Sequence, residues 1–318
     1  MIKLKDIYSL AVQMGIDNDP RGEVAARKQL DKSKRAYDKL KGADKDDYDT
    51  ERLTNPFADT RILYGDPDMP VTSVIAGIDV ETPELLLVDR LRDKGVALDL
   101  VIGHHPEAHA YAGLPDVMPM QSDLWHQFGV PVNVGDALLD ERMREVARGI
   151  MPVNKDRPLD AARLLELPFM CCHTPADNMV TSLLTKDVAA AAPETLQDVI
   201  DWLKTYSEYK AATKAGSGPT IIVGKQDGRA GTVFIDMTGG TGGPRQVIEK
   251  LVAAGVGTIV GMHMSEKNRE EAVKQHLNVV IAGHIASDSI GLNLVLDALE
   301  KKGVAIQAFS GLIRVKRG

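Results

Sequence analysis

The sequence of 318 residues has few aromatic residues, only two cysteines and no long apolar run. Aromatics make up 4%, which argues against the base-stacking surfaces of proteins that bind single-stranded nucleic acid. The net charge of -7 argues against a broad cationic face for phosphate backbones. No segment approaches the roughly 18 apolar residues of a membrane helix, and the start is too short and polar for a secretory signal. These absences predict a cytoplasmic protein without nucleic-acid or membrane partners.

The two cysteines are neighbours in an apolar, strand-like run. Adjacent cysteines such as Cys171 and Cys172 almost never form a disulfide bond with each other. Because the chain has no other cysteine, redox chemistry and a thiolate metal site are both disfavoured.

Composition divides the chain into a charged N-terminal part and an α/β part. Residues 1–60 are dense in charges of both signs and predict an arm with one solvated helix at 23–40. From residue 72 onward, β-branched runs alternate with helical stretches, beginning with SVIAGIDV, PELLLVDRLRDKG and LDLVIGHHP. This alternation predicts an α/β fold in which helices bury the strands.

Two parts of the α/β region are similar to each other. GIDVETPELLLVDRLRDKGVALDLVIGHH aligns with FIDMTGGTGGPRQVIEKLVAAGVGTIVGMH, which matches Asp79 with Asp236 and His105 with His263. This internal repeat predicts two related α/β lobes that deliver histidine and aspartate from the carboxyl ends of strands, where ligands bind in open α/β sheets.

The predicted lobes lie within one α/β domain at residues 61–318. Lobe one would comprise about 61–112 together with 168–190. Lobe two would comprise about 218–318.

Two adjacent histidines, His104 and His105, follow an apolar run and precede Pro106. Neighbouring side chains on an extended segment point to opposite sides, but the backbone turns at a strand end. Pro106 restricts His105 to a fixed local geometry, from which two imidazoles can reach two neighbouring metal ions. The alternative is one surface histidine and one packed histidine.

Two more histidines follow apolar runs, and each has an aspartate four positions later: His173 with Asp177, and His284 with Asp288. If the chain turns helical there, the imidazole and the carboxylate share one face of the helix. Nitrogen and oxygen donors without thiolate suit zinc, manganese or iron(II), and a bridging carboxylate commonly holds two such ions. The alternative is that each aspartate caps a helix start.

The glycine-rich stretch DMTGGTGG precedes a predicted helix. Gly239, Gly240, Gly242 and Gly243 permit close approach of an anion, which predicts a small-molecule substrate that contains phosphate. The stretch lacks the Lys-Ser/Thr of a P-loop and the Rossmann spacing. A tight turn that only packs a strand against a helix is therefore the alternative.

These motifs, with IDVETPELLL and AGHIASDSIGLNLVLDAL, resemble the Ngg-interacting-factor-three-like (Nif3-like) family, whose members are also labelled GTP cyclohydrolase type 2 homologues. The resemblance runs from about residue 73 to the C-terminus. It implies two lobes around a cleft with a dinuclear metal site, and homo-oligomers that form hexameric rings. It places His173 beside the metals and assigns as ligands His104, His105, Asp177, His284 and Asp288, with the two aspartates as candidates to bridge the ions.

The sequence departs from the family pattern in several places. HTPAD replaces the usual His-Thr-Asn-Leu-Asp, and Asp288 stands where glutamate is usual, which shortens that ligand by one methylene. Residues 113–167 read as an insertion that would cap the site, and the charged arm replaces the usual N-terminal motif. These departures predict a subgroup with its own substrate or partner.

The leading hypothesis is a hydrolase that depends on two divalent ions. One ion would polarise a carbonyl, amidine or phosphoryl group while a metal-bound hydroxide attacks it, and His173 or His263 would shuttle the proton. One alternative is a non-catalytic, metal-binding, ring-forming interaction protein, and another is an α/β binding domain without metal. The coordination of the metal separates the hydrolase from the interaction protein, because catalytic sites keep an open position and structural sites are closed by protein ligands.

Overall fold

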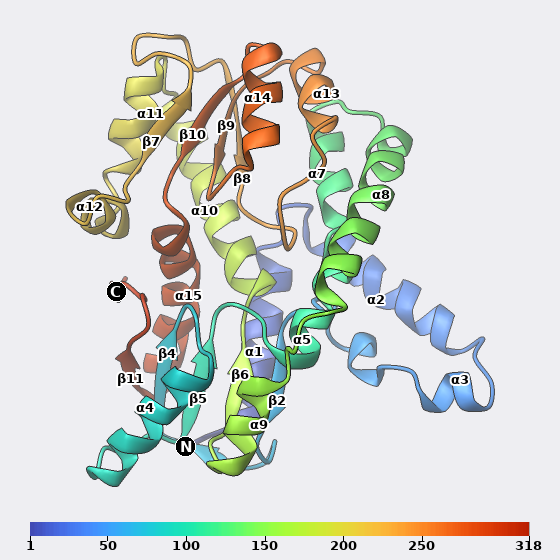
Figure 1. The fold of residues 1–318 in the computed structure, drawn as a ribbon, viewed down its shortest axis with the longest axis vertical. Helices are drawn as coiled ribbons and strands as arrows, with labels where there is room; N and C mark the ends of the chain where they lie inside the picture. The colour runs from blue at the N-terminus through green and yellow to red at the C-terminus, as the bar shows by residue number, and fades with distance from the viewer. Residues whose placement is uncertain (318) are drawn as a thin grey trace.

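Two sheets make up the framework of the computed structural model, which describes residues 1–317 (Figure 1). The first sheet has the order β11 (Ala305–Ala308), β4 (Ser73–Gly77), β5 (Leu100–Gly103), β6 (Phe169–Cys171) and β2 (Arg61–Tyr64). The second has the order β7 (Thr220–Val223), β10 (Asn278–Ile281), β9 (Val256–Gly261) and β8 (Thr232–Asp236). All neighbours are parallel except β2 with β6 and β7 with β10. The predicted α/β fold is therefore confirmed.

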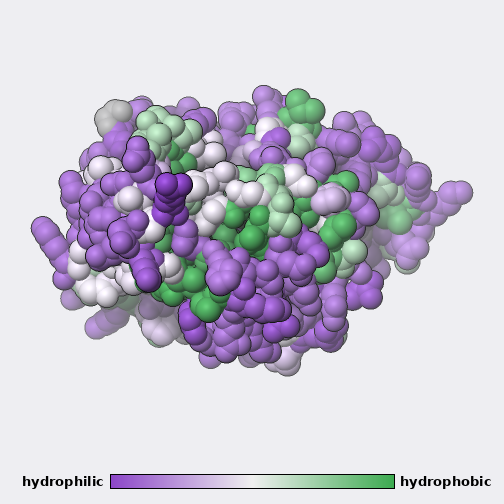
Figure 2. Space-filling view, turned by 90° about the horizontal axis from the view of Figure 1, so that it is seen from above, coloured by the Kyte–Doolittle hydropathy of each residue, from purple (hydrophilic) through white to green (hydrophobic). Residues whose placement is uncertain are grey.

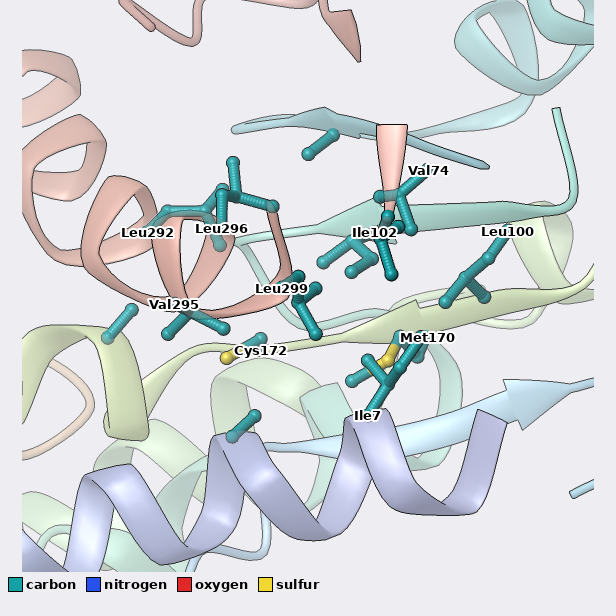
Figure 3. Close-up of a cluster of buried hydrophobic side chains, with 14 of the residues drawn as sticks. Ile7, Val74, Leu100, Ile102, Met170, Cys172, Leu292, Val295, Leu296 and Leu299 are labelled. Atoms are coloured by element: carbon teal, nitrogen blue, oxygen red, sulfur yellow. The ribbon is translucent and has the colours of Figure 1, made fainter. Parts of the chain in front are cut away.

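Helices cover both faces of the first sheet. One face packs against α1 (Leu4–Asp17), α10 (Thr174–Ala191) and α15 (His284–Glu300), and the other against α4 (Thr82–Asp93), α5 (Ala108–Ala112) and α9 (Arg157–Leu164). Figure 3 shows the first of these cores, with Leu299 of α15 and Ile7 of α1 directed at the strands. Because the strands are buried on both faces, their sequences read as continuous apolar runs.

The second sheet is also covered on both sides. One face packs against α11 (Leu196–Leu203), α12 (Ser207–Lys214), α10 and α15, and the other against α7 (Met120–Gln127), α8 (Val132–Ile150), α13 (Val247–Ala253) and α14 (Glu266–Lys274). Both α10 and α15 thus contribute to the cores of both sheets, and Figure 1 shows them running through the centre of the molecule.

The two aligned segments of the sequence form equivalent units. In each, a strand is followed by a helix and then by a parallel neighbouring strand, as β4-α4-β5 in the first sheet and β8-α13-β9 in the second. The last strand of the chain, β11, returns to the first sheet and pairs with β4.

Only part of the predicted charged arm, residues 1–60, stands away from the body. Helix α1 buries Leu4, Ile7 and Ala11 in the core of the first sheet, and β1 (Ile2–Lys3) pairs with β3 (Pro70–Val71). Helix α2 (Glu23–Tyr37) is the predicted solvated helix, mostly exposed, and it projects outward with α3 (Ala43–Asp46) in Figure 1. The 3-10 helix η1 (Thr50–Leu53) leads the chain back to β2.

Residues 113–167, expected as an insertion, fold into α6 (Leu114–Val117), α7, α8 and α9. Trp125 of α7 and Leu139 of α8 pack on the second sheet, while Leu159 of α9 packs on the first.

None of the helices in residues 1–317 combines the length and apolar character needed to cross a bilayer. Figure 2 shows a face covered mainly by hydrophilic residues, with small hydrophobic groups near its middle.

Candidate metal centre

Four of the strand-end histidines meet in space. His104 and His105 follow β5, His173 lies between β6 and α10, and His284 is the first residue of α15 after β10. The ring centroids of His104 and His173 are 5.0 Å apart, and those of His105 and His284 are 5.1 Å apart. The carboxyl ends of strands in the two sheets therefore face one common point.

Asp288 lies between three of these imidazoles. Its Oδ1 is 3.5 Å from Nε2 of His104, and its Oδ2 is 3.4 Å from Nε2 of His105 and 3.5 Å from Nε2 of His284. The side chains of Asp288 and His104 are buried, whereas His284 is 40% exposed. Donor atoms of His104, His105 and Asp288 lie close enough together to hold one metal ion.

Asp177 occupies the equivalent position on α10. Its Oδ1 is 3.4 Å from Nε2 of His104, and its Oδ2 is 3.6 Å from Nε2 of His173. Donor atoms of His104, His173 and Asp177, all buried, lie within reach of one metal ion as well. His173, which was expected only beside the metals, is thus one of the three residues of this second candidate ligand group.

A close crossing of α10 and α15 brings the two aspartates together. A Cβ added at Gly291 would lie 2.2 Å from the carbonyl oxygen of Ala176, so only glycine permits this approach. Gly291 is three residues after Asp288, and Ala176 directly precedes Asp177. The crossing point is therefore next to both carboxylates.

Each first-lobe histidine is held through Nδ1. The partners are the carbonyl oxygen of Cys172 for His104 (3.1 Å), Asp79 for His105 (2.6 Å) and Asp59 for His173 (2.7 Å). When Nδ1 donates a hydrogen bond, a neutral imidazole presents the lone pair of Nε2 to the cluster. The internal repeat marked Asp79 without assigning it a role, whereas no sequence pattern pointed to Asp59.

Several buried donor atoms of the cluster have no hydrogen-bond partner among residues 1–317. They are Nε2 of His104, Oδ1 of Asp177 and both carboxylate oxygens of Asp288. No lysine or arginine in this part of the chain forms an ion pair with either aspartate. Unpaired buried carboxylates are costly, and a bound cation would remove this cost. The donor set therefore fits divalent metal ions.

Electrostatic coupling shifts the titration of the cluster. Burial alone would lower the pKa of His104, but Asp288 and Asp177 raise it well above its usual value. Burial would also lower the pKa of His105, but the nearby carboxylates of Asp288 and Asp79 outweigh it and raise this pKa to about 9. Burial would raise the pKa of the Asp288 carboxyl, but His104 and His105 hold it far below its ordinary range. Without metal, protons on the imidazoles compensate the carboxylate charge.

The cluster opens into a cavity of about 460 Å³. Beyond the cluster, its walls include His263, Thr238, Thr241 and Asp236, all from the carboxyl ends of β8 and β9. The ring of His263 stacks edge-on against His284 at 5.1 Å, outside both ligand groups. Burial lowers the pKa of His263, which keeps this imidazole neutral.

The glycine loop forms one side of the cavity and packs against α7. A Cβ on Gly239 would lie 2.5 Å from Cγ of Gln121, and one on Gly243 would lie 2.9 Å from Trp125. Gln121 also donates a hydrogen bond to the carbonyl of Gly239 at 2.6 Å. The alternative of tight packing accounts for these two glycines, while Gly240 and Gly242 line the cavity. Anion binding at this loop stays a prediction.

Comparison with known proteins supports the same architecture. The chain aligns with a NIF3 superfamily protein from Sphaerobacter thermophilus with a TM-score of 0.72 and 29% sequence identity, covering 80% of this chain and 92% of that chain. The chain shares the fold of this NIF3 superfamily protein. The resemblance inferred from its strand-end motifs is thus confirmed.

Two further solved structures are similar at a lower level. Reduced HcgD from Methanocaldococcus jannaschii aligns with a TM-score of 0.47 and 14% identity over 78% of this chain and 87% of its own. TTHA1606 from Thermus thermophilus aligns with a TM-score of 0.46 and 15% identity, covering 78% and 86% of the two chains. No protein-family model and no curated protein sequence matches the chain.

Proposed function

We propose that this protein is a hydrolase whose activity depends on two divalent metal ions held between the lobes. The observation that supports this most is the buried cluster of carboxylate and imidazole atoms without partners among residues 1–317. The proposed ligands are His104, His105, His173, Asp177, His284 and Asp288. Their nitrogen and oxygen donors suit zinc, manganese or iron(II).

When bound, the ions would supply Lewis acidity for hydrolysis of a carbonyl, amidine or phosphoryl group. The protein itself supplies shape and proton transfer. The cavity beside the cluster gives a small molecule access to the proposed ligands His173, Asp177, His284 and Asp288, which line it. His263, which lies outside the ligand groups and whose pKa is lowered by burial, would accept a proton from the attacking water and donate it to the leaving group.

The loop with Gly240 and Gly242 carries the proposal of a phosphate-containing substrate. Both glycines line the cavity, so their backbone is accessible to a ligand that reaches the cluster. The hydroxyl-bearing residues Thr238 and Thr241 line the same wall. A substrate with an anionic group on that side would place its reacting group toward the metals.

Metal content tests whether the proposed ligands bind metal ions. Protein purified without added metal is analysed by mass spectrometry for bound ions, beside Asp177→Ala, His284→Ala and the control His109→Ala. His109 is exposed on α5 and outside both ligand groups. We expect about two ions per chain in the wild type and the control, and fewer in the other variants. Equal metal content in all four proteins contradicts the proposed site.

Turnover tests the catalytic part. Metal-loaded protein is screened against nucleotides, phosphodiesters and cyclic amides, with His263→Ala as the variant that should lose rate while it retains metal. A metal-loaded protein that turns over none of these substrates favours the alternative of a ring-forming interaction protein. The hexameric ring is a separate proposal, and light scattering coupled to gel filtration measures it.

A further inference from the structure

We infer that Asp59, delivered by the N-terminal segment at residues 55–61, is the positioning residue that makes His173 a metal ligand. This inference rests on the proposed metal centre and adds a part of the chain that carries no metal-site motif. It also assigns a role to a segment that the charge pattern marked only as an arm.

Asp59 and its neighbour hold both the ring and the backbone of His173. The Oδ2 atom of Asp59 accepts hydrogen bonds from Nδ1 of His173 at 2.7 Å and from Oγ1 of Thr174 at 2.6 Å. The backbone N–H of His173 donates to Oγ1 of Thr60 at 3.0 Å. All four residues are buried, with Asp59 fully inaccessible to solvent. The imidazole is therefore fixed before α10 begins.

The segment that carries Asp59 is itself held rigidly. Asn55 donates to the carbonyl of Thr60 and accepts from the backbone N–H of Phe57. The guanidinium of Arg61, buried at 2% exposure, donates to the carbonyls of Phe57 and Thr60. Phe57 packs against Val12 of α1 in a separate small core. These contacts tie the position of Asp59 to the folding of the N-terminal part.

The contact decides which nitrogen of His173 faces the cluster. With Nδ1–H donated to Asp59, the Nε2 lone pair points to the side where Asp177 lies at 3.6 Å. A carboxylate partner at Nδ1 also orients the ring and strengthens it as a metal ligand. Carboxylate, imidazole and metal form a common triad in which loss of the carboxylate typically costs about 10–100-fold in metal affinity.

The charge of Asp59 leads to the same conclusion. Its Oδ1 is buried without a hydrogen-bond partner, and His173 is its one ion-pair partner within residues 1–317. A buried carboxylate with a single ion-pair partner and an unpaired oxygen is poorly compensated. A cation bound at Nε2 of that imidazole would compensate it through the ring.

Asp59 could instead serve only to anchor the start of α10 through Thr174. That structural role and the positioning role differ in what they change. If Asp59 is only an anchor, its loss lowers the stability of the metal-free protein and leaves the metal affinity of the folded molecules unaltered. Loss of a positioning carboxylate lowers metal affinity in a folded protein.

The test compares metal binding by full-length wild type, Asp59→Asn, Asp59→Ala and Asp79→Asn. Asp79 is the matched case, because it holds Nδ1 of His105 in the other ligand group. Metal-free proteins are titrated with Zn²⁺ in competition with a chelator, and Co²⁺ spectra report the ligand field. Circular dichroism and melting of the metal-free proteins establish which variants are folded.

We expect Asp59→Asn to bind one of two ions about 10–100-fold more weakly, with an altered Co²⁺ spectrum, and Asp59→Ala to be weaker still. Asp79→Asn should alter the spectrum differently, since it perturbs the other group. If Asp59→Asn is folded and binds two ions with wild-type affinity, the inference is overturned and Asp59 is an anchor. If the wild type itself binds no metal, the proposed metal centre falls and takes this inference with it.

Discussion

At the scale of single residues, the metal centre is set by which atoms of each side chain are already engaged. Nδ1 of His105 is bound to Asp79, so Nε2 is the atom that meets Asp288 at 3.4 Å. Buried carboxylates draw protons onto these imidazoles when no metal is present. Metal and protons therefore compete for the same nitrogen atoms.

This competition predicts a steep pH dependence of metal binding. The metal-free pKa of His105 is raised to about 9, so this residue carries a proton at neutral pH that the metal must displace. Because this proton must leave, each pH unit below about 9 weakens the apparent affinity for metal about tenfold. The raised pKa of His104 adds to the effect. We expect a gain in affinity of at least about 100-fold from about pH 6 to about pH 8, measured in chelator-buffered titrations. Affinity that is constant over this range contradicts the prediction.

Asp236 carries a second pH effect, on stability. Burial raises the pKa of its carboxyl to about 6 in the folded protein, above the ordinary value of 3.8. The folded protein binds this proton more tightly than the unfolded chain does. The resulting stabilisation is complete below about pH 4 and is lost as the pH rises through 6. Asp236→Asn should therefore raise the free energy of unfolding by up to about 3 kcal/mol at about pH 7.5 and leave it unchanged at about pH 4. Urea unfolding of the metal-free proteins at both pH values measures this.

At the scale of elements, the crossing of α10 and α15 is the decisive feature. Each helix starts at the carboxyl end of a strand in a different sheet and carries one aspartate of the cluster in its first turns. Their residues then pack into the cores of both sheets, so this pair of helices is shared by the two lobes. The separation of Asp177 and Asp288 depends on how closely these helices approach.

Gly291→Ala tests this dependence. Its new Cβ would lie 2.2 Å from the carbonyl oxygen of Ala176, so the helices must move apart. We expect a loss of about 3 kcal/mol in the free energy of unfolding and weaker metal retention. Thermal melting and metal analysis check both effects.

Gly149→Ala is the matched control for that change. Gly149 lies near the end of α8, and a Cβ there meets nothing within 4 Å. Replacing a helical glycine at an open position should stabilise the protein by about 0.5–1 kcal/mol. Equal effects of the two substitutions would show that the crossing tolerates a side chain.

At the scale of the whole molecule, the proposed ligands join segments that are far apart in the chain. His104 and His105 come from the first lobe, whereas His284 and Asp288 follow a strand of the second sheet. A metal ion between them would link the lobes in the folded protein, and the unfolded chain offers no such site. Metal binding should therefore stabilise the entire fold.

The expected size of this effect follows from mass action. At free metal roughly 1,000-fold above Kd, one site contributes about 4 kcal/mol, which corresponds to a rise in Tm on the order of 10 °C. Scanning calorimetry with added Zn²⁺ and with a chelator measures the shift. Asp288→Ala should show little metal-dependent shift, because Asp288 contacts three of the proposed ligands.

The sequence by itself determined the alternation of strands and helices and the histidines that end the strands. Those signals are local: apolar runs mark buried strands, and residues four apart, such as His173 and Asp177, share a helix face. The family resemblance added the ligand set around His104 and His105. These features need only neighbouring residues to be recognised.

Only the tertiary structure decided that Asp59 holds His173, that Asp79 holds His105 and that Gly291 lets two helices touch. The residues in each contact are separated by many positions along the chain, and a single sequence contains no period or motif that pairs them. Such contacts arise when whole elements pack, because burial in two separate cores sets the distances between them.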